Sequence, residues 1–288
     1  MRRIRPTYTR SQANSIRNTS DPPASVPIRV ETYSQLVREV AKIANLNHTQ
    51  TLYFRGQDHD HQNKAGKTSL YPEIYRGDPL SRAEASARFE VLESASAQLV
   101  DTLPLAIDHN REDLRRRKFV RWAILQHYNV CATPFLDVTQ SIHVACSFAT
   151  HNNNGNYGYV YVLGFPYLNS RIGLDAEEEL VNVRLLSISP PEALRPHFQE
   201  GYVAATLDVT DDYNDKTELD FNRRLIIKFE IPMKDTFWGE GFGPIPAEQL
   251  FPDNEDQVLK AILDLKEISD RMARPGDIGR FVQLWSLL

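Results

Sequence analysis

The sequence predicts an α+β domain in which N-terminal helices are followed by a mixed or antiparallel β core. Segments with helical apolar periodicity dominate the first half of the chain, and strand-like apolar runs dominate the second half. The two kinds of segment do not alternate regularly, which is typical of the α+β class. We expect residues 1–28 to form a basic, disordered arm and residues 29–288 to form a single domain.

Five helices are expected in the first and last parts of the chain. Apolar residues recur every three or four positions over 33–44, and Ser81 and Glu84 match a capping box that opens a helix reaching about residue 103. Further helices are predicted over 112–128 and 255–272, with Leu263 among the buried residues of the latter. Another helix follows Asp137 and Thr139, either of which is placed to cap it.

Five strands are expected between and after these helices. The first is the apolar run 52–57, and the others span 158–163, 181–188, 202–207 and 224–231. β-branched and aromatic residues dominate these runs, and glycine or proline bounds most of them. Pro232 closes the last strand.

Composition narrows the class of protein. Of the 288 residues, 41% are hydrophobic and 25% are charged, as in ordinary soluble globular proteins. The chain has no apolar run of the roughly 18 residues that a membrane span needs, so no membrane partner is expected. The first residues lack the hydrophobic core of a secretory signal. Two cysteines, Cys131 and Cys146, fit a reducing compartment, and together these features predict a cytoplasmic protein.

Charge is unevenly distributed along the chain. The net charge of −5 argues against a general nucleic-acid coat protein. The predicted arm nevertheless carries Arg2, Arg3, Arg5, Arg10 and Arg17, so it could contact RNA or an acidic partner, or be a solvated tail. The basic run 115–118, continued by Arg121, is either a solvated helix face or an anion-binding surface.

An arginine at the end of the first predicted strand is the most informative local feature. In the run 52–57, side chains alternate between faces, so Arg55 points away from Leu52 and Phe54. Gly56 lacks the Cβ that would keep a ligand away from the backbone. A guanidinium beside exposed backbone suits a phosphate or a carboxylate, and a structural ion pair is an equal alternative.

Histidines supply two further observations. His59 and His61 lie beside Asp58 and Asp60, which is the composition of a metal site, but no compact second ligand pair follows, so no metal is expected. His127 lies near the end of a predicted helix and shortly before the motif-rich stretch 133–141, and it either satisfies a hydrogen bond of the core or belongs to a site.

Several of these motifs, in this order, resemble the FRG domain family, which is common in bacterial and phage-related proteins. They are Phe54-Arg55-Gly56, Gln126-His127-Tyr128, Leu136-Asp137-Val138-Thr139 with Phe148-Ala149, and Phe251-Pro252-Asp253. Ser69 and Arg76 also match positions that family members usually share. The resemblance covers about residues 30–265. The chain departs from the family pattern Pro-Thr-Arg-Leu-Leu-Asp-Trp-Thr, because residues 132–139 lack its arginine and its tryptophan.

A more distant resemblance is to ADP-ribosyltransferases. Their pattern is an arginine or histidine ending one strand, a Ser/Thr-rich strand entering a helix, and a glutamate near a later strand. Arg55, the stretch 137–141 and Glu200 are similar to these three elements. The resemblance implies the ADP-ribosyltransferase scaffold and NAD as substrate. It also implies a toxin-type effector that modifies an RNA or protein acceptor, as in phage defence.

The resemblance also implies roles for individual residues. Arg55, His127 and Glu200 would be the catalytic residues, with Glu200 stabilising positive charge on the ribose. The residues expected to bind nucleotide are Gly56, Gln57, Ser69, Arg76, Tyr128, Asp137, Thr139 and Ser141. A non-catalytic nucleotide- or RNA-binding module is the alternative function, and RNA hydrolysis by His127 is a third. The sequence leaves the oligomeric state open.

Overall fold

The computed structural model describes residues 1–16, 26–77, 80–103, 111–190, 193–252 and 256–272. The strands among them are β1 (Ile28–Arg29), β2 (Thr51–Gln57), β3 (Leu136–Thr139), β4 (Tyr157–Phe165), β5 (Ile172–Asp175), β6 (Leu180–Arg184), β7 (Gly201–Thr206) and β8 (Leu225–Pro232). The helices are α1 (Arg10–Ser15), α3 (Tyr33–Leu46), α4 (Arg82–Thr102), α5 (Arg111–Arg116), α6 (Lys118–His127), α7 (Ile142–Thr150), α8 (Leu185–Ile188), α9 (Arg195–Phe198), α10 (Ala247–Leu250) and α11 (Gln257–Met272). The predicted α+β class is therefore confirmed.

The eight strands form one mixed sheet in the order β1-β8-β4-β2-β3-β7-β6-β5. Only the short β1 runs parallel to its neighbour β8, and the other pairs are antiparallel. Strand β2 pairs with β4 along its whole length, from Thr51 to Gln57, whereas it pairs with β3 only where Phe54 lies opposite Thr139. The sheet therefore splits between β2 and β3, and this split determines where the candidate site lies.

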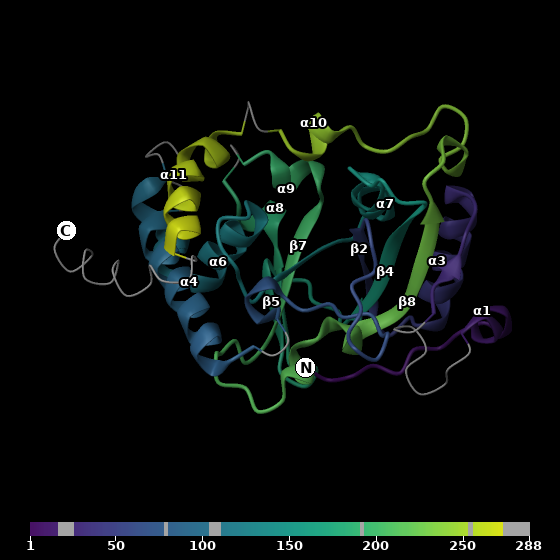
Figure 1. Ribbon diagram of the computed structural model, residues 1–288, viewed down its shortest axis with the longest axis horizontal. Helices are drawn as coiled ribbons and strands as arrows, with labels where there is room; N and C mark the ends of the chain where they lie inside the picture. Colours follow the sequence, from purple (N-terminus) through teal and green to yellow (C-terminus); the bar gives the residue numbers. More distant parts are fainter. Residues whose placement is uncertain (17–25, 78–79, 104–110, 191–192, 253–255, 273–288) are drawn as a thin grey trace.

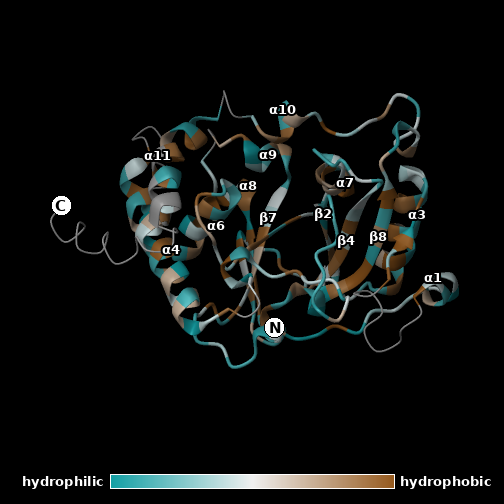
Figure 2. Ribbon diagram, in the orientation of Figure 1, coloured by the Kyte–Doolittle hydropathy of each residue, from teal (hydrophilic) through white to brown (hydrophobic). Residues whose placement is uncertain are grey.

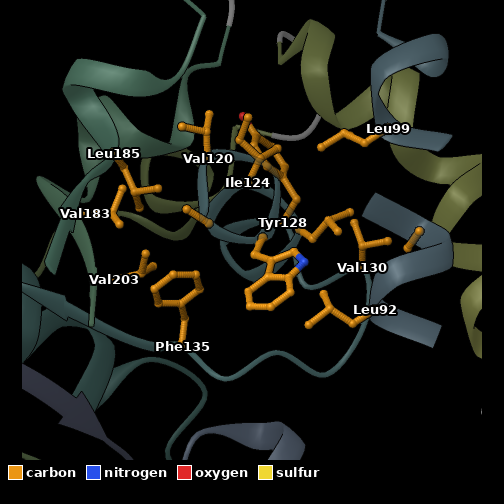
Figure 3. Packing of buried hydrophobic residues seen from close by; sticks show 14 of the residues in the cluster. Leu92, Leu99, Val120, Ile124, Tyr128, Val130, Phe135, Val183, Leu185 and Val203 are labelled. Carbon is orange, nitrogen blue, oxygen red and sulfur yellow. The ribbon is translucent and has the colours of Figure 1, made fainter. Parts of the chain in front are cut away.

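Helices cover the two halves of the sheet separately (Figure 1). Helix α3 lies beside β8, and together with α7 it encloses an apolar core that includes residues of β2, β4 and β8. Helices α4, α6 and α11 lie at the other end and enclose a second core with β6 and β7. In this second core, Val183, Leu185 and Val203 face Ile124 and Phe135 (Figure 3). Hydrophobic residues follow β4 and much of β8 through the middle of the molecule (Figure 2).

Two glycines let helix α7 approach the sheet closely. A Cβ on Gly56 would lie 1.8 Å from the carbonyl oxygen of Ala145, and a Cβ on Gly158 would lie 2.4 Å from that of Ala149. No side chain fits at such distances, so both positions require glycine. Gly56 is therefore needed to pack a helix of the protein itself, which differs from the sequence-based interpretation that it admits a ligand to the backbone.

The N-terminal segment 1–16 is ordered against the domain and is not the disordered arm that the sequence predicts. The hydroxyl of Tyr8 donates to the carbonyl oxygen of Ile226 (2.6 Å), and the backbone N–H of Thr7 donates to Asn47 (2.8 Å). Ile16 is buried in the core formed by α3 and α7. Apolar side chains among the arginines anchor the segment to the sheet. Residues 17–25 of the predicted arm lie outside the described residues.

Most predicted elements are confirmed, including the capping box of Ser81 and Glu84 at the start of α4. The predicted helix 112–128 is instead two helices, α5 and α6, because the backbone of Arg117 is extended. The guanidinium of Arg121 donates to the carbonyl oxygens of Leu114 (2.5 Å) and Arg115 (3.0 Å), which satisfies acceptors at the end of α5. Arg121 is thus structural rather than part of a solvated basic face.

Three further expectations are corrected. The strand predicted over 181–188 ends at Arg184, and a single helical turn, α8, follows it. Helix α7 is capped by Ser141, whose hydroxyl accepts from the N–H of Val144, and not by Asp137 or Thr139. Leu263, predicted to be buried on α11, is 52% exposed.

Candidate functional site

A cavity of about 780 Å³ lies at the split between β2 and β3. Its volume falls within the roughly 300–1,000 Å³ of typical ligand pockets. We call it the donor cavity. Segments far apart in the sequence form its wall: β2, the end of α6, β3, the start of β7, α9 and α11. The described residues lining it are Phe54, Arg55, Gly56, Gln126, His127, Tyr128, Asn129, Asp137, Val138, Thr139, Phe148, Arg195, Gln199, Gly201, Tyr202, Phe251, Leu259, Lys260, Leu263 and Lys266.

Arg55 bridges the split in the sheet. Because β3 diverges from β2, the carbonyl oxygen of Asp137 has no strand partner on that side, and Nη1 of Arg55 donates to it instead (2.7 Å). The buried Nε of Arg55 has no hydrogen-bond partner in the described part of the protein. Burial lowers the pKa of Arg55, and the nearby Asp137 partly opposes that shift. An arginine remains charged even so, which leaves a partly desolvated cation in the cavity wall.

A histidine and an aspartate form the titratable pair of the donor cavity. Nδ1 of His127 lies 3.7 Å from Oδ1 of Asp137. The other carboxylate oxygen of Asp137 accepts from Nε2 of Gln126 (2.5 Å), and the hydroxyl of Thr133 donates to the side-chain Oε1 of Gln126. These bonds orient the carboxylate. Oδ1 of Asp137 and Nε2 of His127 are buried without a hydrogen-bond partner among the described residues, so each can accept or donate to a ligand.

The first two elements predicted for the site lie on the neighbouring strands β2 and β3, and the third, Glu200, comes directly before β7, the next strand of the sheet. Phe54 pairs with Thr139 across β2 and β3, and Thr139 pairs with Gly201 across β3 and β7. The hydroxyl of Thr139 donates to the carbonyl oxygen of Glu200 (3.2 Å). A Cβ on Gly201 would lie 3.2 Å from the His127 ring, so glycine leaves room for the imidazole. The residue after Glu200 thus shapes the cavity.

Glu200 itself is not where the sequence analysis expects it. Its side chain is exposed and does not line the donor cavity, although its neighbours Gln199 and Gly201 do. Its backbone adopts a left-handed conformation with φ of 44°, in the turn that leads into β7. That turn directs the side chain away from the wall. The carboxylate that the described residues place in the cavity is Asp137, which was predicted from the sequence to bind nucleotide or to cap a helix, and not to be catalytic.

Of the other predicted site residues, some line a second cavity and one has a structural role instead. Gln57, Ser69 and Arg76 line a second cavity of about 580 Å³, which also includes Arg55. Ser141 lines neither of these two cavities and serves as the cap of α7.

Tyr128 lines the donor cavity, but its hydroxyl donates to Oδ2 of Asp256 (2.6 Å). Burial and the adjacent Asp256 raise the pKa of Tyr128 well above its usual value. The Tyr128 phenol is therefore held neutral as a hydrogen-bond donor to Asp256.

Sequence reasoning missed three cationic residues of the donor cavity. Arg195 lies with its guanidinium carbon 5.4 Å from the ring centre of Tyr128 and 5.7 Å from that of Phe251. Lys260 and Lys266 come from α11. The motif containing Phe251 was the only sequence signal for this wall. Together with Arg55 these residues make four basic side chains among the described residues of the wall, where the one carboxylate is that of Asp137, so the cavity favours an anionic ligand.

The described residues contain no group of three or more potential metal ligands, and His59 pairs with Asp58 (2.7 Å). Among the helices formed by the described residues, none has the length and apolar character that crossing a membrane requires.

Comparison with known proteins identifies one domain. Residues 50–157 match the model of the FRG domain family. No curated protein and no solved structure matches the chain. The match begins just before β2 and ends at the first residue of β4, so it includes Arg55, His127, Asp137 and Thr139. It is narrower than the expected range 30–265, because β7, α9 and α11 lie outside it.

Proposed function

We propose that the donor cavity binds a dinucleotide such as NAD and that the protein transfers its ADP-ribosyl group to an acceptor. The observation that carries this proposal is the placement of Arg55, Thr139 and the pair of His127 and Asp137 on one cation-lined wall. A diphosphate is the natural ligand of such a set of cations. The distant resemblance to ADP-ribosyltransferases supports the same assignment.

The proposed reaction breaks the bond between C1′ of the ribose and the pyridinium nitrogen of NAD. The electron pair of that bond leaves with nicotinamide, which becomes neutral, and a nucleophilic oxygen or nitrogen of the acceptor forms the new bond to C1′. The acceptor loses one proton. Positive charge develops on the ribose during the reaction, and a fixed carboxylate near C1′ lowers the energy of that transition state.

Residue roles follow from position. Arg55, with Arg195, Lys260 and Lys266, would bind the diphosphate. Asp137, rather than the exposed Glu200, would stabilise the charge on the ribose through its unpartnered Oδ1. His127, 3.7 Å from that oxygen, would take the proton from the acceptor, as histidines commonly do in general base catalysis.

Two measurements test this proposal: binding of NAD by calorimetry, and release of nicotinamide from labelled NAD. We expect Asp137→Asn to lower kcat roughly a hundred- to a thousandfold while the Kd for NAD stays similar, as when one electrostatic group of an active site is lost. Glu200→Gln is the matched control and should change kcat by less than about twofold. A large loss in the Glu200 variant with none in the Asp137 variant would reverse the assignment.

A second candidate function is a non-catalytic nucleotide-binding module. The exposed position of Glu200 favours it, because the carboxylate that the resemblance requires is then missing from the cavity. Binding of NAD without release of nicotinamide, in the presence of protein and RNA acceptors, would support this module. Absence of NAD binding would exclude the transferase, whereas binding of another nucleotide or of RNA would then still support the module.

The role as a toxin-type effector adds an observable outcome in cells. If the protein modifies a cellular acceptor, expression of the wild-type chain should slow bacterial growth, and Asp137→Asn should relieve that effect at equal protein level. If Glu200→Gln relieved the growth defect and Asp137→Asn did not, the assignment of Asp137 as the catalytic carboxylate would be wrong.

A further inference from the structure

We propose that the second cavity seats one nucleotide of a single-stranded nucleic acid, which is the acceptor of the reaction. This inference rests on the proposed function, because it names the acceptor class for the same site. The cavity, which we call the acceptor cavity, has a volume of about 580 Å³ and shares Arg55 with the donor cavity. Each of the two cavities alone is large enough for a small ligand.

The charge of the acceptor cavity fits a phosphate. Lys64, Arg76 and Lys216 line it beside Arg55, and no carboxylate appears among the described residues of its wall. The pKa of His61, also on the wall, lies below its usual value, first because of partial burial and then because His59, Arg76 and Arg55 add positive charge nearby. A ligand with negative charge relieves this repulsion.

The polar groups of the cavity fit a base. The side-chain amide oxygen Oε1 of Gln57 is buried and has no hydrogen-bond donor among the described residues. Exocyclic amino groups of cytosine, adenine and guanine supply such a donor, whereas uracil and thymine lack an exocyclic amine and offer only their ring N3–H. Tyr71 adds an aromatic ring on the wall, with Nζ of Lys216 4.8 Å from its centre. Cations next to an aromatic ring and an amide are typical of single-strand binding.

The wall of the acceptor cavity is held in place before any ligand arrives. Asp60, in the loop that follows β2, accepts hydrogen bonds from Lys228 (2.7 Å), Thr68 (2.7 Å) and Tyr161 (3.0 Å). The same loop closes on itself through a bridge between Gln62 and Thr68. Gln57 lies just before this anchored region and Lys64 lies within the part closed by the bridge, so a ligand would bind without ordering the loop.

Arg55 gives the two cavities a common side chain. Because Arg55 lines both, a donor in one and an acceptor in the other would lie next to the same guanidinium. A transfer reaction requires this proximity of its two substrates. The cation and amide lining favours a nucleotide over a peptide acceptor, and a modified peptide is therefore an outcome that contradicts the proposal.

Two matched double variants test the proposal that the acceptor cavity binds a single-stranded nucleic acid. Fluorescence anisotropy measures binding of short labelled oligo(C), oligo(A) and oligo(U), and calorimetry measures binding of NAD to the same protein. We expect Arg76→Gln with Lys216→Gln to weaken oligonucleotide binding about tenfold or more and reduce its salt dependence, with NAD affinity changed less than about twofold. Lys260→Gln with Lys266→Gln should produce the reverse pattern. Retained NAD binding shows that the first double variant is folded.

The base preference gives an independent readout. Wild-type protein should bind oligo(C) and oligo(A) more tightly than oligo(U), and Gln57→Leu should reduce that difference. Equal losses from both double variants, or modification of a peptide but not of an oligonucleotide, would overturn the proposal. A protein that binds NAD but no oligonucleotide would also overturn it and leave the proposed function intact. Failure to bind NAD would overturn the proposed function instead.

Discussion

At the scale of single residues, Arg55 combines a structural role with the proposed ligand-binding role. Its guanidinium supplies the hydrogen bond that the carbonyl oxygen of Asp137 lacks at the split in the sheet. Loss of a hydrogen bond to a charged group costs roughly 1.5–3 kcal/mol. An alanine at this position would therefore remove stability as well as ligand affinity, so the double variants described above separate the two cavities more cleanly than Arg55→Ala does.

Asp60 leads to a pH-dependent prediction at the same scale. Burial pushes the pKa of Asp60 upward, but hydrogen bonds from Lys228, Gln62 and Thr68 outweigh it, so the pKa lies below its usual value. A lowered folded-state pKa stabilises the fold above the unfolded value of about 3.9, and this contribution is lost as the pH falls through the folded value. Lys228 is fully buried, so it depends on this partner.

We therefore expect Asp60→Asn to lower the free energy of unfolding by about 3–5 kcal/mol near neutral pH, as when one partner of a buried ion pair is removed. The difference from wild type should shrink in acid, as the pH falls below the unfolded value of about 3.9 towards the lowered pKa of folded Asp60. Urea unfolding near neutral pH and in acid measures it. Asp58→Asn is the control, because this exposed pair with His59 contributes little. A difference that does not change with pH would contradict the prediction.

At the scale of elements, the contact between α7 and β2 gives a second stability prediction. Gly56→Ala would place a Cβ 1.8 Å from the carbonyl oxygen of Ala145, so the helix must move away from the sheet. We expect a loss of about 3 kcal/mol or more, at the upper end of overpacking effects. Gly243→Ala should cost less than about 1 kcal/mol, because nothing lies within 4 Å of that position.

The midpoint of urea unfolding measures both glycine variants. Similar unfolding midpoints for Gly56→Ala and Gly243→Ala would contradict the prediction, because they would show that α7 moves away from the sheet without loss of stability. A displaced α7 would also move Ser141, its cap, and Thr139, whose hydroxyl accepts from the N–H of Ser141 (3.1 Å). NAD binding should therefore weaken in Gly56→Ala and not in Gly243→Ala.

The helices and strands also show which structural features can be predicted from the sequence. Strands with local apolar patterns and the capping box at Ser81 were predicted correctly, because neighbouring residues determine them. The break at Arg117 was missed, since the side chain of Arg121 that stabilises the end of α5 acts only after the chain folds back. The strand predicted through Ile188 ended early because Leu185 begins a helical turn whose apolar residues pack into the same core.

The residues of the candidate site also divide into those that a local sequence pattern reveals and those that only the folded chain brings together. The motif residues Arg55, His127 and Asp137 were found because they lie in short recognisable runs. Arg195 and the lysines of α11 carry no local pattern, and only the fold brings them to the cavity. The position of Glu200 could not be predicted, since it depends on a left-handed turn at a non-glycine residue.

At the scale of the whole molecule, the N-terminal segment 1–16 contacts residues from distant parts of the chain, from Glu179 to Ile226, and its removal gives the final prediction. Ile4 and Tyr8 pack against the core of α3 and α7, and Ile16 is buried there. Full burial of an aliphatic side chain contributes about 1.5–3 kcal/mol, and the hydrogen bond from Tyr8 to Ile226 adds roughly 1 kcal/mol. Truncation of residues 1–16 should therefore lower the free energy of unfolding by several kcal/mol and expose apolar surface that binds a hydrophobic dye.

The control for this truncation keeps the segment and removes charge. Arg5 and Arg10 are exposed, so Arg5→Gln with Arg10→Gln should change stability by less than about 0.5 kcal/mol. Urea unfolding and RNA binding, measured on the truncated and the double-variant proteins, distinguish a structural segment from a mobile RNA-binding arm. If truncation removes RNA binding but leaves the unfolding midpoint unchanged, the segment is a mobile arm and its packing contributes nothing. If truncation lowers the midpoint while the double variant keeps both stability and RNA binding, the segment is part of the folded domain, and the acceptor cavity is the region to test for nucleic acid.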